Sequence, residues 1–562
     1  GARFDGDIGG TLTIQGAISS TGYRSTTAPS DPSKLDADDL LQGGSAVIVA
    51  GDVAGGIILA VPPADSSTTD TDEDKDGIED SKEGSAAVRS YGAAPAMRIG
   101  SDARDIAIGA VPATGTGYGL IIDGTIAGAG VYSGVQGTGL QVGGMGHAVT
   151  IAGGIGIGGT VSASANGASA TALRMGAGAS TPLIHVTGKV EASGSNAAGT
   201  AATGIAIDSG ASVAGIRNAG SIKATASGED GTARGIVDAS GTVSLVENSG
   251  AISASGAKAD SGRNIAIDLS AATGNVVVKQ TAVASGKTAP SIVGDIRFGA
   301  GNNLLDIADG TVTGDTTFGA GADTLTLSGD AVYTGKVAFG GGGATMSVTG
   351  TSLFNGTADF GGAASTLDVG TGSAFAGTLA NAGNLAVTLA GGQMALSQPA
   401  QISSLAVTDK GLLAITLGDA GNTAPLLDVS GAASFAADSR IALRVTDVEK
   451  AVGDHLILRA GTLTGAGNIT TDTTLVPFLY DATLANSGND LTVTLAKKSV
   501  SDLGLNRSEA AAFDAVYAAL AKDAKVAGAF LGITEGKTFR ASLRQMLPDH
   551  AGGVFETVTR GS

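Results

Sequence analysis

Cysteine and tryptophan are absent from this chain of 562 residues, and aromatic residues make up only 4% of it. Without cysteine the chain can form no disulfide bond and has no thiolate for catalysis or metal binding. No run of about 18 continuously apolar, uncharged residues predicts a membrane-spanning helix. The opening residues GARFDGDIGG lack the basic start and apolar core of a signal peptide, so an exported chain would already have lost its signal.

Positive charge is also scarce. The chain carries 33 lysines and arginines against 52 aspartates and glutamates, which gives a net charge of −19 and a pI near 4.5. Nucleic acids bind clustered basic residues because their phosphates are negative, so a nucleic-acid partner is not expected. The same balance disfavours binding to anionic lipid and keeps an extended surface soluble.

Glycine and small aliphatic residues are abundant instead. The chain has 91 glycines, and 43% of its residues are apolar. Collagen needs glycine at every third position, which is not seen here. Disordered chains have few of the valines, isoleucines and leucines that recur here in alternating clusters. Short β-branched runs among glycines indicate short strands joined by tight turns.

A short repeat runs through the middle of the chain. Phenylalanines recur at a nearly constant spacing of about 20 residues, and apolar residues follow each of them seven and nine positions later. Apolar positions two residues apart have the period of a β-strand. The repeated positions are Phe298, Phe318, Phe339 and Phe360, then Leu305, Leu325, Met346 and Leu367, then Ile307, Leu327, Val348 and Val369.

A longer repeat precedes the short one. Similar segments begin at Ile184, Ile216 and Val246, at intervals of about 30 residues, so these turns should carry longer loops. Asn218 and Asn248 take the same place in two of the segments. They form either a binding pair or a stack of turn asparagines, and we favour the stack.

Neither repeat can bury its apolar side alone. When such a chain coils so that each strand pairs with the strand of the next turn, the apolar sides form one continuous core. Propeller blades need longer repeats, and leucine-rich repeats need a leucine and asparagine pattern that is not seen. The predicted fold is therefore all-β: a right-handed parallel β-helix, or β-solenoid, with a short helical C-terminal segment.

One strong chemical motif lies in an insertion at residues 62–90. Residues 72–83 read DEDKDGIEDSKE and match the twelve-residue calcium loop, which needs oxygen ligands at positions 1, 3, 5, 7, 9 and 12 and glycine at position 6. Gly77 takes the glycine position. The motif resembles the loops of thrombospondin type 3 repeats and dockerins, and a solvated acidic loop is the alternative interpretation. We expect a structural Ca²⁺ ion bound by Asp72, Asp74, Asp76, the Ile78 carbonyl, Asp80 and Glu83.

Residues suited to catalysis are few. No H-x-x-x-H, E-x-x-H or G-x-S-x-G motif occurs, and no helical pattern follows the G-x-G-x-x-G that begins at Gly154. Aspartates expected on turns form no evident pair for glycoside cleavage. We expect no enzymatic activity, with a polysaccharide lyase or hydrolase as the alternative. The residues considered are His147, His185, His455, His550, Asp295, Asp306, Asp315 and Asp323.

The pattern changes beyond about residue 400, where longer alternating strands with turn signals are expected. Asn506 and Glu509 form a capping box before a helix. A second helix should end before Pro548, because proline cannot continue a helix. The apolar stripes of the two helices are Phe513, Val516, Tyr517 and Leu520, and Phe539, Leu543, Met546 and Leu547.

The C-terminal stretch LGLNRSEAAAFDAVYAAL…FRASLRQMLPDHAGGVFETVTRGS resembles the junction before the membrane barrel of autotransporters, the type V secreted proteins of Gram-negative and especially alphaproteobacterial bacteria. The FGAG…DTLTLSG repeats are similar to passenger rungs of that family. The resemblance implies a passenger domain whose residues 401–500 form an autochaperone-like cap that nucleates folding outside the cell. The family's C-terminal β-barrel does not follow Ser562, which agrees either with cleavage at this point or with a sequence that holds the passenger part alone.

The expected organisation is an irregular N-terminal tip with insertions in residues 1–100, the calcium-loop insertion at 62–90, β-solenoid rungs in 101–400, the cap in 401–500 and a helical linker toward the barrel in 501–562. By resemblance the chain should act at the cell surface or outer membrane, or after release, as a structural stalk or adhesin. The alternatives are a self-assembling filament or layer subunit and a carbohydrate-active β-helix enzyme. Expected partners are its own β-barrel, the outer-membrane assembly machinery, further copies of itself and an unidentified surface or host ligand.

Overall fold

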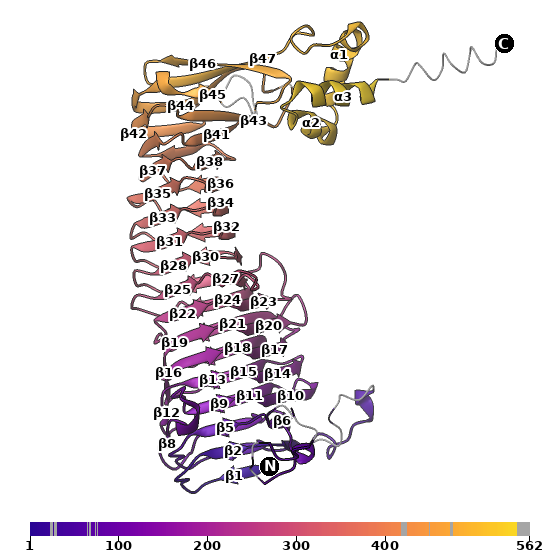
Figure 1. Ribbon diagram of the computed structural model, residues 1–562, viewed down its shortest axis with the longest axis vertical. Coiled ribbons are helices and arrows are strands. Elements are labelled where there is room, and N and C mark those ends of the chain that lie inside the picture. The colour runs from indigo at the N-terminus through magenta and orange to yellow at the C-terminus, as the bar shows by residue number, and fades with distance from the viewer. Residues whose placement is uncertain are drawn as a thin grey trace, which may run out of the picture. The chain divides into compact units, whose positions relative to one another are not determined.

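The computed structural model describes residues 1–22, 26, 31–63, 66, 69–73, 75, 77–417, 424–448, 450–471 and 476–547. The chain forms two compact units, residues 1–343 and residues 344–562. Both units are built from parallel strands, and the helices α1 (Arg507–Leu520), α2 (Ala524–Leu531) and α3 (Gly536–Met546) lie near the C-terminus (Figure 1). The predicted all-β, solenoid-like fold with a helical C-terminal segment is confirmed at this level.

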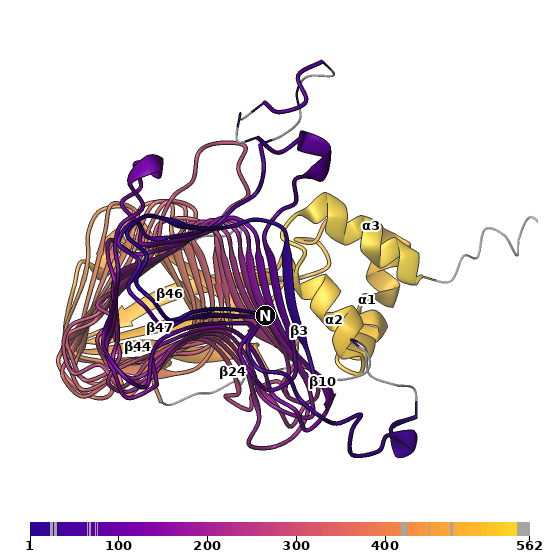
Figure 2. The same cartoon turned by 90° about the horizontal axis from the view of Figure 1, so that it is seen from below.

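Unit 1 consists of three columns of short strands, in which each strand pairs in parallel with the strand of the next turn. Figure 2 shows these turns winding round a common interior. The first column contains β3 (Ala17–Thr21), β6 (Ala87–Tyr91), β10 (Thr125–Ser133), β14 (Thr160–Asn166), β17 (Lys189–Gly194), β20 (Ser221–Ala226), β23 (Ala251–Ser255), β26 (Ser291–Val293), β29 (Thr311–Thr313) and β32 (Val332–Ala338).

The second and third columns repeat the same parallel arrangement. The second contains β1 (Ala2–Phe4), β4 (Val47–Val49), β7 (Met97–Ile99), β11 (Gly137–Val142), β15 (Ala170–Met175), β18 (Ala201–Ile207), β21 (Thr232–Asp238), β24 (Asn264–Leu269), β27 (Asp295–Phe298) and β30 (Thr316–Thr317). The third contains β2 (Leu12–Ile14), β5 (Ile57–Leu59), β8 (Ile106–Ile108), β9 (Leu120–Ile122), β12 (Val149–Ile151), β13 (Ile155–Ile157), β16 (Ala179–Val186), β19 (Ser212–Asn218), β22 (Leu245–Asn248), β25 (Val277–Gln280), β28 (Leu304–Ile307) and β31 (Asp323–Leu327).

The short repeat aligns one turn above the next. Leu305 pairs with Leu325, and Ile307 pairs with Leu327, so the apolar positions of successive repeats stack in the interior. The rings of Phe298 and Phe318 are parallel, with centroids 4.7 Å apart, and Phe339 continues the stack at 5.1 Å from Phe318. The spacing read from the sequence therefore equals one turn of the coil.

The longer repeat is aligned by a ladder of buried amides. Asn218 donates from Nδ2 to Oδ1 of Asn248 at 2.8 Å, and Asn248 donates to Oε1 of Gln280 at 3.0 Å. All three side chains are buried. The stacked interpretation of the asparagines is confirmed, although they occupy the ends of β19 and β22 rather than turns.

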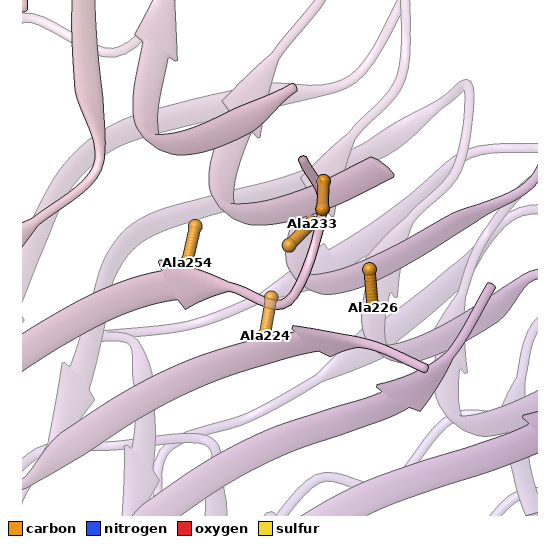
Figure 3. Close-up of a cluster of buried hydrophobic side chains, with 5 residues drawn as sticks. Ala224, Ala226, Ala233 and Ala254 are labelled. Atoms are coloured by element: carbon orange, nitrogen blue, oxygen red, sulfur yellow. The ribbon is translucent and has the colours of Figure 1, made fainter. Parts of the chain in front are cut away.

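The corner between the first and second columns is narrow in the long repeats. Figure 3 shows that small side chains gather there from β20, β21 and β23. A Cβ added to the neighbouring Gly235 would lie 2.4 Å from the Ala266 carbonyl oxygen, so the backbones themselves approach closely. Side chains larger than alanine would not fit this corner. The cluster consists of Ala224, Ala226, Ala233, Ala254 and Ala257.

Residues 1–100, where an irregular tip was expected, contain strands β1 to β7, and these join the same three columns. Two insertions interrupt them. The first follows β3 and contains the 3-10 turn η1 (Pro32–Lys34), and the second follows β5 and contains η2 (Asp80–Lys82).

Unit 2 begins with further parallel pairs and ends with antiparallel strands. One column contains β34 (Leu353–Asp359), β36 (Ala374–Ala380), β38 (Gln393–Leu396), β41 (Leu412–Leu417), β43 (Arg440–Val445) and β45 (Thr470–Thr471). The other contains β33 (Ala344–Val348), β35 (Ser365–Gly370), β37 (Leu385–Ala390), β39 (Ala400–Ile402), β40 (Ser404–Thr408), β42 (Leu427–Phe435) and β44 (Gly453–Thr464), to which β47 (Asp490–Lys497) and β46 (Tyr480–Ser487) add in antiparallel fashion.

The helical segment packs round aromatic side chains. Phe539 on α3 meets Phe530 of α2 edge-on, with centroids 5.8 Å apart, and it also contacts Phe513 of α1. The predicted capping box is present, because Asn506 accepts from the Glu509 N–H and Glu509 accepts from the Asn506 N–H. The short helix α2 between the two expected helices was not predicted.

Candidate functional site

The acidic insertion forms a tight turn at the predicted glycine position. Gly77 has φ 90°, and its N–H donates to Oδ2 of Asp72 at 3.2 Å. The chain then enters η2, where the Asp80 N–H donates to the Thr71 carbonyl at 2.8 Å. A glycine at position 6 whose backbone turns back toward position 1 is what the calcium loop requires.

One predicted ligand atom of this loop has no hydrogen-bond partner among the described residues. Oδ1 of Asp72, the predicted first ligand, is buried and accepts no hydrogen bond from the part of the chain that the structure describes. A buried carboxylate oxygen without a partner is unfavourable, and a bound cation would satisfy it. Asp80 accepts from the Glu73 N–H at 3.3 Å, and Glu83 accepts from Nε2 of Gln15 at 3.5 Å. The donor set of carboxylates and one carbonyl suits Ca²⁺.

The rest of the predicted ligand set is only partly visible. Asp74 and Asp76 lie outside the described residues, and Ile78 is exposed. Among the described residues, no three acidic or histidine side chains lie close enough together to hold a metal ion. That search leaves out Asp74 and Asp76, so calcium binding stays a prediction.

Two of the four aspartates considered for catalysis lie in one cleft. Asp295 and Asp315 line a cavity of about 530 Å³ together with Asp260, and the Asp315 N–H donates to Oδ1 of Asp295 at 3.2 Å. Partial burial raises the pKa of Asp295, and the charges of Asp315 and Asp260 add to this, while Arg297 opposes it. A pair of carboxylates with one raised pKa is a feature of glycoside-cleaving sites.

The other two aspartates lie apart from this cleft. Asp306 is on the outer face of β28, where partial burial raises its pKa and Lys279 opposes the shift. Asp323 is buried at the start of β31 and accepts two hydrogen bonds from Asn303. The expectation that the aspartates lie on turns is therefore wrong for these two and for Asp295, the first residue of β27, because all three belong to strands.

The described histidines form no catalytic group. His455 is buried on β44, with Nε2 2.6 Å from the Ala451 carbonyl oxygen, and His147 lies 3.4 Å from Asp105. His550 lies outside the described residues. His185 is on the outer face of β16, where its Nδ1 is 2.8 Å from the Tyr118 hydroxyl. Sequence reasoning missed Tyr118, because it comes from a loop outside the repeat.

No family model, no curated protein and no solved structure matches the chain. Among the residues that the structure describes, no helix has the length and apolar character needed to cross a membrane.

Proposed function

We propose that this chain is the passenger of an autotransporter of a Gram-negative bacterium, a right-handed parallel β-helix that serves at the cell surface as a stalk or adhesin. The observation that carries the proposal is the one-turn register of the strands, as in the ladder Val190–Ile222–Ile252. Such a coil presents the same outward positions turn after turn. Connections between parallel strands are almost always right-handed, which supports the handedness.

The C-terminal part supports a folding role for residues 401–500. There the parallel strands give way to the antiparallel strands β44, β47 and β46, which end the run of parallel pairing. The hydroxyls of Tyr480 and Tyr517 both donate to the Val448 carbonyl, so this part also holds helix α1. A segment that is stable by itself can template the next turn, because the stability of a solenoid is a sum over neighbouring turns.

Deletion tests this folding role. We expect a chain without residues 401–500 to lose the protease resistance of residues 101–343 during refolding. A matched control lacks residues 1–100, a segment of equal length at the other end, and should keep it. Circular dichroism measures the refolding rate of each deletion variant. Equal rates for the two variants would refute the folding role of residues 401–500.

Calcium has a structural role in the proposal. A bound ion would be held by Asp72, Asp80, Glu83 and the Ile78 carbonyl, with Asp74 and Asp76 completing the set, and would neutralise this acidic insertion. Calorimetry should find one Ca²⁺ site that Asp72→Ala removes. Glu79→Gln, at a position that supplies no ligand, is the matched control and should keep it. If calorimetry detects no heat of binding at millimolar Ca²⁺, the solvated acidic loop is the interpretation that stands.

Electron microscopy of the purified chain separates the stalk from a self-assembling filament or layer. Discrete rods with and without Ca²⁺ agree with a stalk, whereas polymers that need Ca²⁺ agree with assembly.

The cleft of Asp295 and Asp315 favours a second candidate, a carbohydrate-active enzyme. Adjacent strands lie about 4.8 Å apart, which is close to the separation of about 5–5.5 Å between the carboxyl groups of retaining glycosidases. The test is whether the chain releases reducing ends from a polysaccharide. The activity would be established if Asp295→Asn abolishes this release and Asp306→Asn does not change it.

A further inference from the structure

Three successive turns of the third column form a shallow trough on the outside of unit 1. Strands β9, β13 and β16 pair in register, with Gly156 between Ile121 and His185 (Figure 1). The residues that follow the three strands are Asp123, Gly158 and Thr187, in the same order. The middle strand thus offers Gly156 at its outward position and is followed by Gly158, so no side chain of this segment fills the space.

The glycines are needed because neighbouring side chains lean over them. A Cβ at Gly156 would lie 2.6 Å from the Tyr118 ring, and one at Gly158 would lie 2.5 Å from Oδ1 of Asp123. With strands about 4.8 Å apart, the side chains on the flanking turns stand about 9.6 Å from one another. A cavity of about 310 Å³ remains between them.

Tyr118 closes one end of the trough. It belongs to the loop between β8 and β9 that contains the 3-10 turn η3 (Pro112–Thr114). Its hydroxyl reaches Nδ1 of His185, two turns away, and the two rings meet edge-on with centroids 6.1 Å apart. The ring gives the trough an apolar wall with a fixed position.

His185 lines the cavity, and among the described residues only its Nδ1 has a hydrogen-bond partner. Burial lowers its pKa, the cation Arg217 lowers it further, and Glu247 opposes the shift. Because Tyr118 occupies Nδ1, the atom Nε2 is left as a donor or an acceptor, according to the tautomer.

Asp123 supplies a carboxylate on the opposite side. Its side chain is exposed and makes no hydrogen bond to any other residue that the structure describes. Partial burial nevertheless raises its pKa. Its two oxygens are therefore available to accept hydrogen bonds from a ligand, and the hydroxyl of Thr187 lies in the same lining.

These groups fit a sugar ring. A sugar has neighbouring hydroxyls, and a carboxylate can accept hydrogen bonds from two of them. It also has apolar C–H edges, which an aromatic ring can contact. No lysine or arginine among the described residues lines the cavity, and the chain carries a net charge of −19, so anionic sugars are disfavoured. We infer that the trough between Tyr118, Asp123 and His185 binds a neutral or amino sugar unit of a surface glycan. This inference deepens the adhesin proposal and rests on it.

The test measures how much of the intact chain is retained on a printed array of neutral, amino, sialylated and sulfated glycans. We expect neutral or amino glycans to retain it. Asp123→Asn and Tyr118→Ala, which removes the aromatic wall, should each lower retention at least tenfold, and Gly158→Val should abolish it by filling the trough while Tyr118 and His185 stay in place. Asp306→Asn, another outward aspartate of the same column, is the matched control and should bind as the unmodified chain does.

Several outcomes would overturn the inference. Background signal for the whole array, a preference for sialylated or sulfated glycans, or equal retention of all variants would each do so. Circular dichroism melting of every variant separates loss of binding from loss of fold. A further outcome is that the chain forms discrete rods in electron microscopy and needs residues 401–500 to fold, yet binds no glycan on the array. This result would refute sugar binding in the trough and would leave the passenger proposal intact.

Discussion

The long and short turns of unit 1 share one architecture but fill it differently. Along the first column, one long turn takes about 30 residues and one short turn about 20 residues. The extra residues of the long turns lie partly in longer strands and partly in longer loops, and strand pairing continues through both regions. The strands of the long turns start at Lys189, Ser221 and Ala251, and those of the short turns start at Ser291, Thr311 and Val332.

The interiors of the two regions differ in side-chain size. The position held by Ile207 and Leu269 in the long turns becomes Phe298 in the short ones, and Phe318 and Phe339 follow in the same stack. The short-turn strands β29 and β30 have three and two residues, where the long-turn strands β20 and β21 have six and seven. Fewer inward positions must fill the interior, so each carries a larger side chain.

The largest effect should come from breaking the aromatic stack. Phe318→Ala removes a ring that contacts rings on both sides and leaves a cavity, and we expect a loss of about 3–5 kcal/mol of unfolding free energy. Urea unfolding followed by circular dichroism measures it. Phe318→Leu, which keeps most of the volume, should lose much less. A loss below about 1 kcal/mol for the alanine variant would mean that the stack does not stabilise the short turns.

The next effect should come from the amide ladder of the long turns. Asn248→Leu leaves Oε1 of Gln280 without its donor, at a cost of about 1–3 kcal/mol for this buried group, while Nδ2 of Asn218 loses Asn248 but keeps the Ala251 carbonyl at 3.0 Å. Hydrogen exchange of the long turns should speed up. Asn166→Leu, at an exposed position on β14, is the control. Unchanged exchange in both variants would show that the ladder sets no register.

Overpacking the alanine corner should cost less. Ala233→Leu adds three carbon atoms where five alanines meet, and we expect a loss of about 1–3 kcal/mol. Ala233→Ser, which adds a single atom, is the comparison. The midpoint of thermal unfolding is a sufficient readout. If the leucine variant is as stable as the unmodified chain, the corner is wider than the close backbone approach indicates.

The smallest effect concerns Tyr333, a buried residue of the short turns. Its hydroxyl contacts the carbonyls of Gly314 and Lys336 and the hydroxyl of Thr316, and burial raises its pKa. Tyr333→Phe should cost about 0.5–1.5 kcal/mol at pH 7.

The pH dependence of Tyr333 has a definite sign. Because the folded-state pKa is raised, the contribution of Tyr333 is complete below the unfolded pKa of about 10 and declines as the pH rises above it. The difference in unfolding free energy between Tyr333→Phe and the unmodified chain should therefore shrink from pH 9 to pH 11. A constant difference across this range would contradict the raised pKa.

Much of the fold could be predicted, and less of the candidate sites. The pairing of Leu305 with Leu325 followed from spacing alone, since each residue meets its equivalent one turn later. The turn at Gly77 followed from a local motif. The meeting of Asp260 with Asp295 and Asp315 could not be predicted, because Asp260 lies in a loop outside the repeat.

The amino-acid sequence by itself determined the strand columns and the inward positions of this chain. Both follow from periodicity, which relates residues at a constant separation. The tertiary structure alone decided which loop residues reach the outer faces, as when Tyr118 reaches over Gly156 to His185. A loop has no constant offset to the turns that it crosses, so its contacts depend on where the folded backbone leaves room. Gly156 of β13 and Gly158 after it provide that room, and the neighbouring strands β9 and β16 provide the walls.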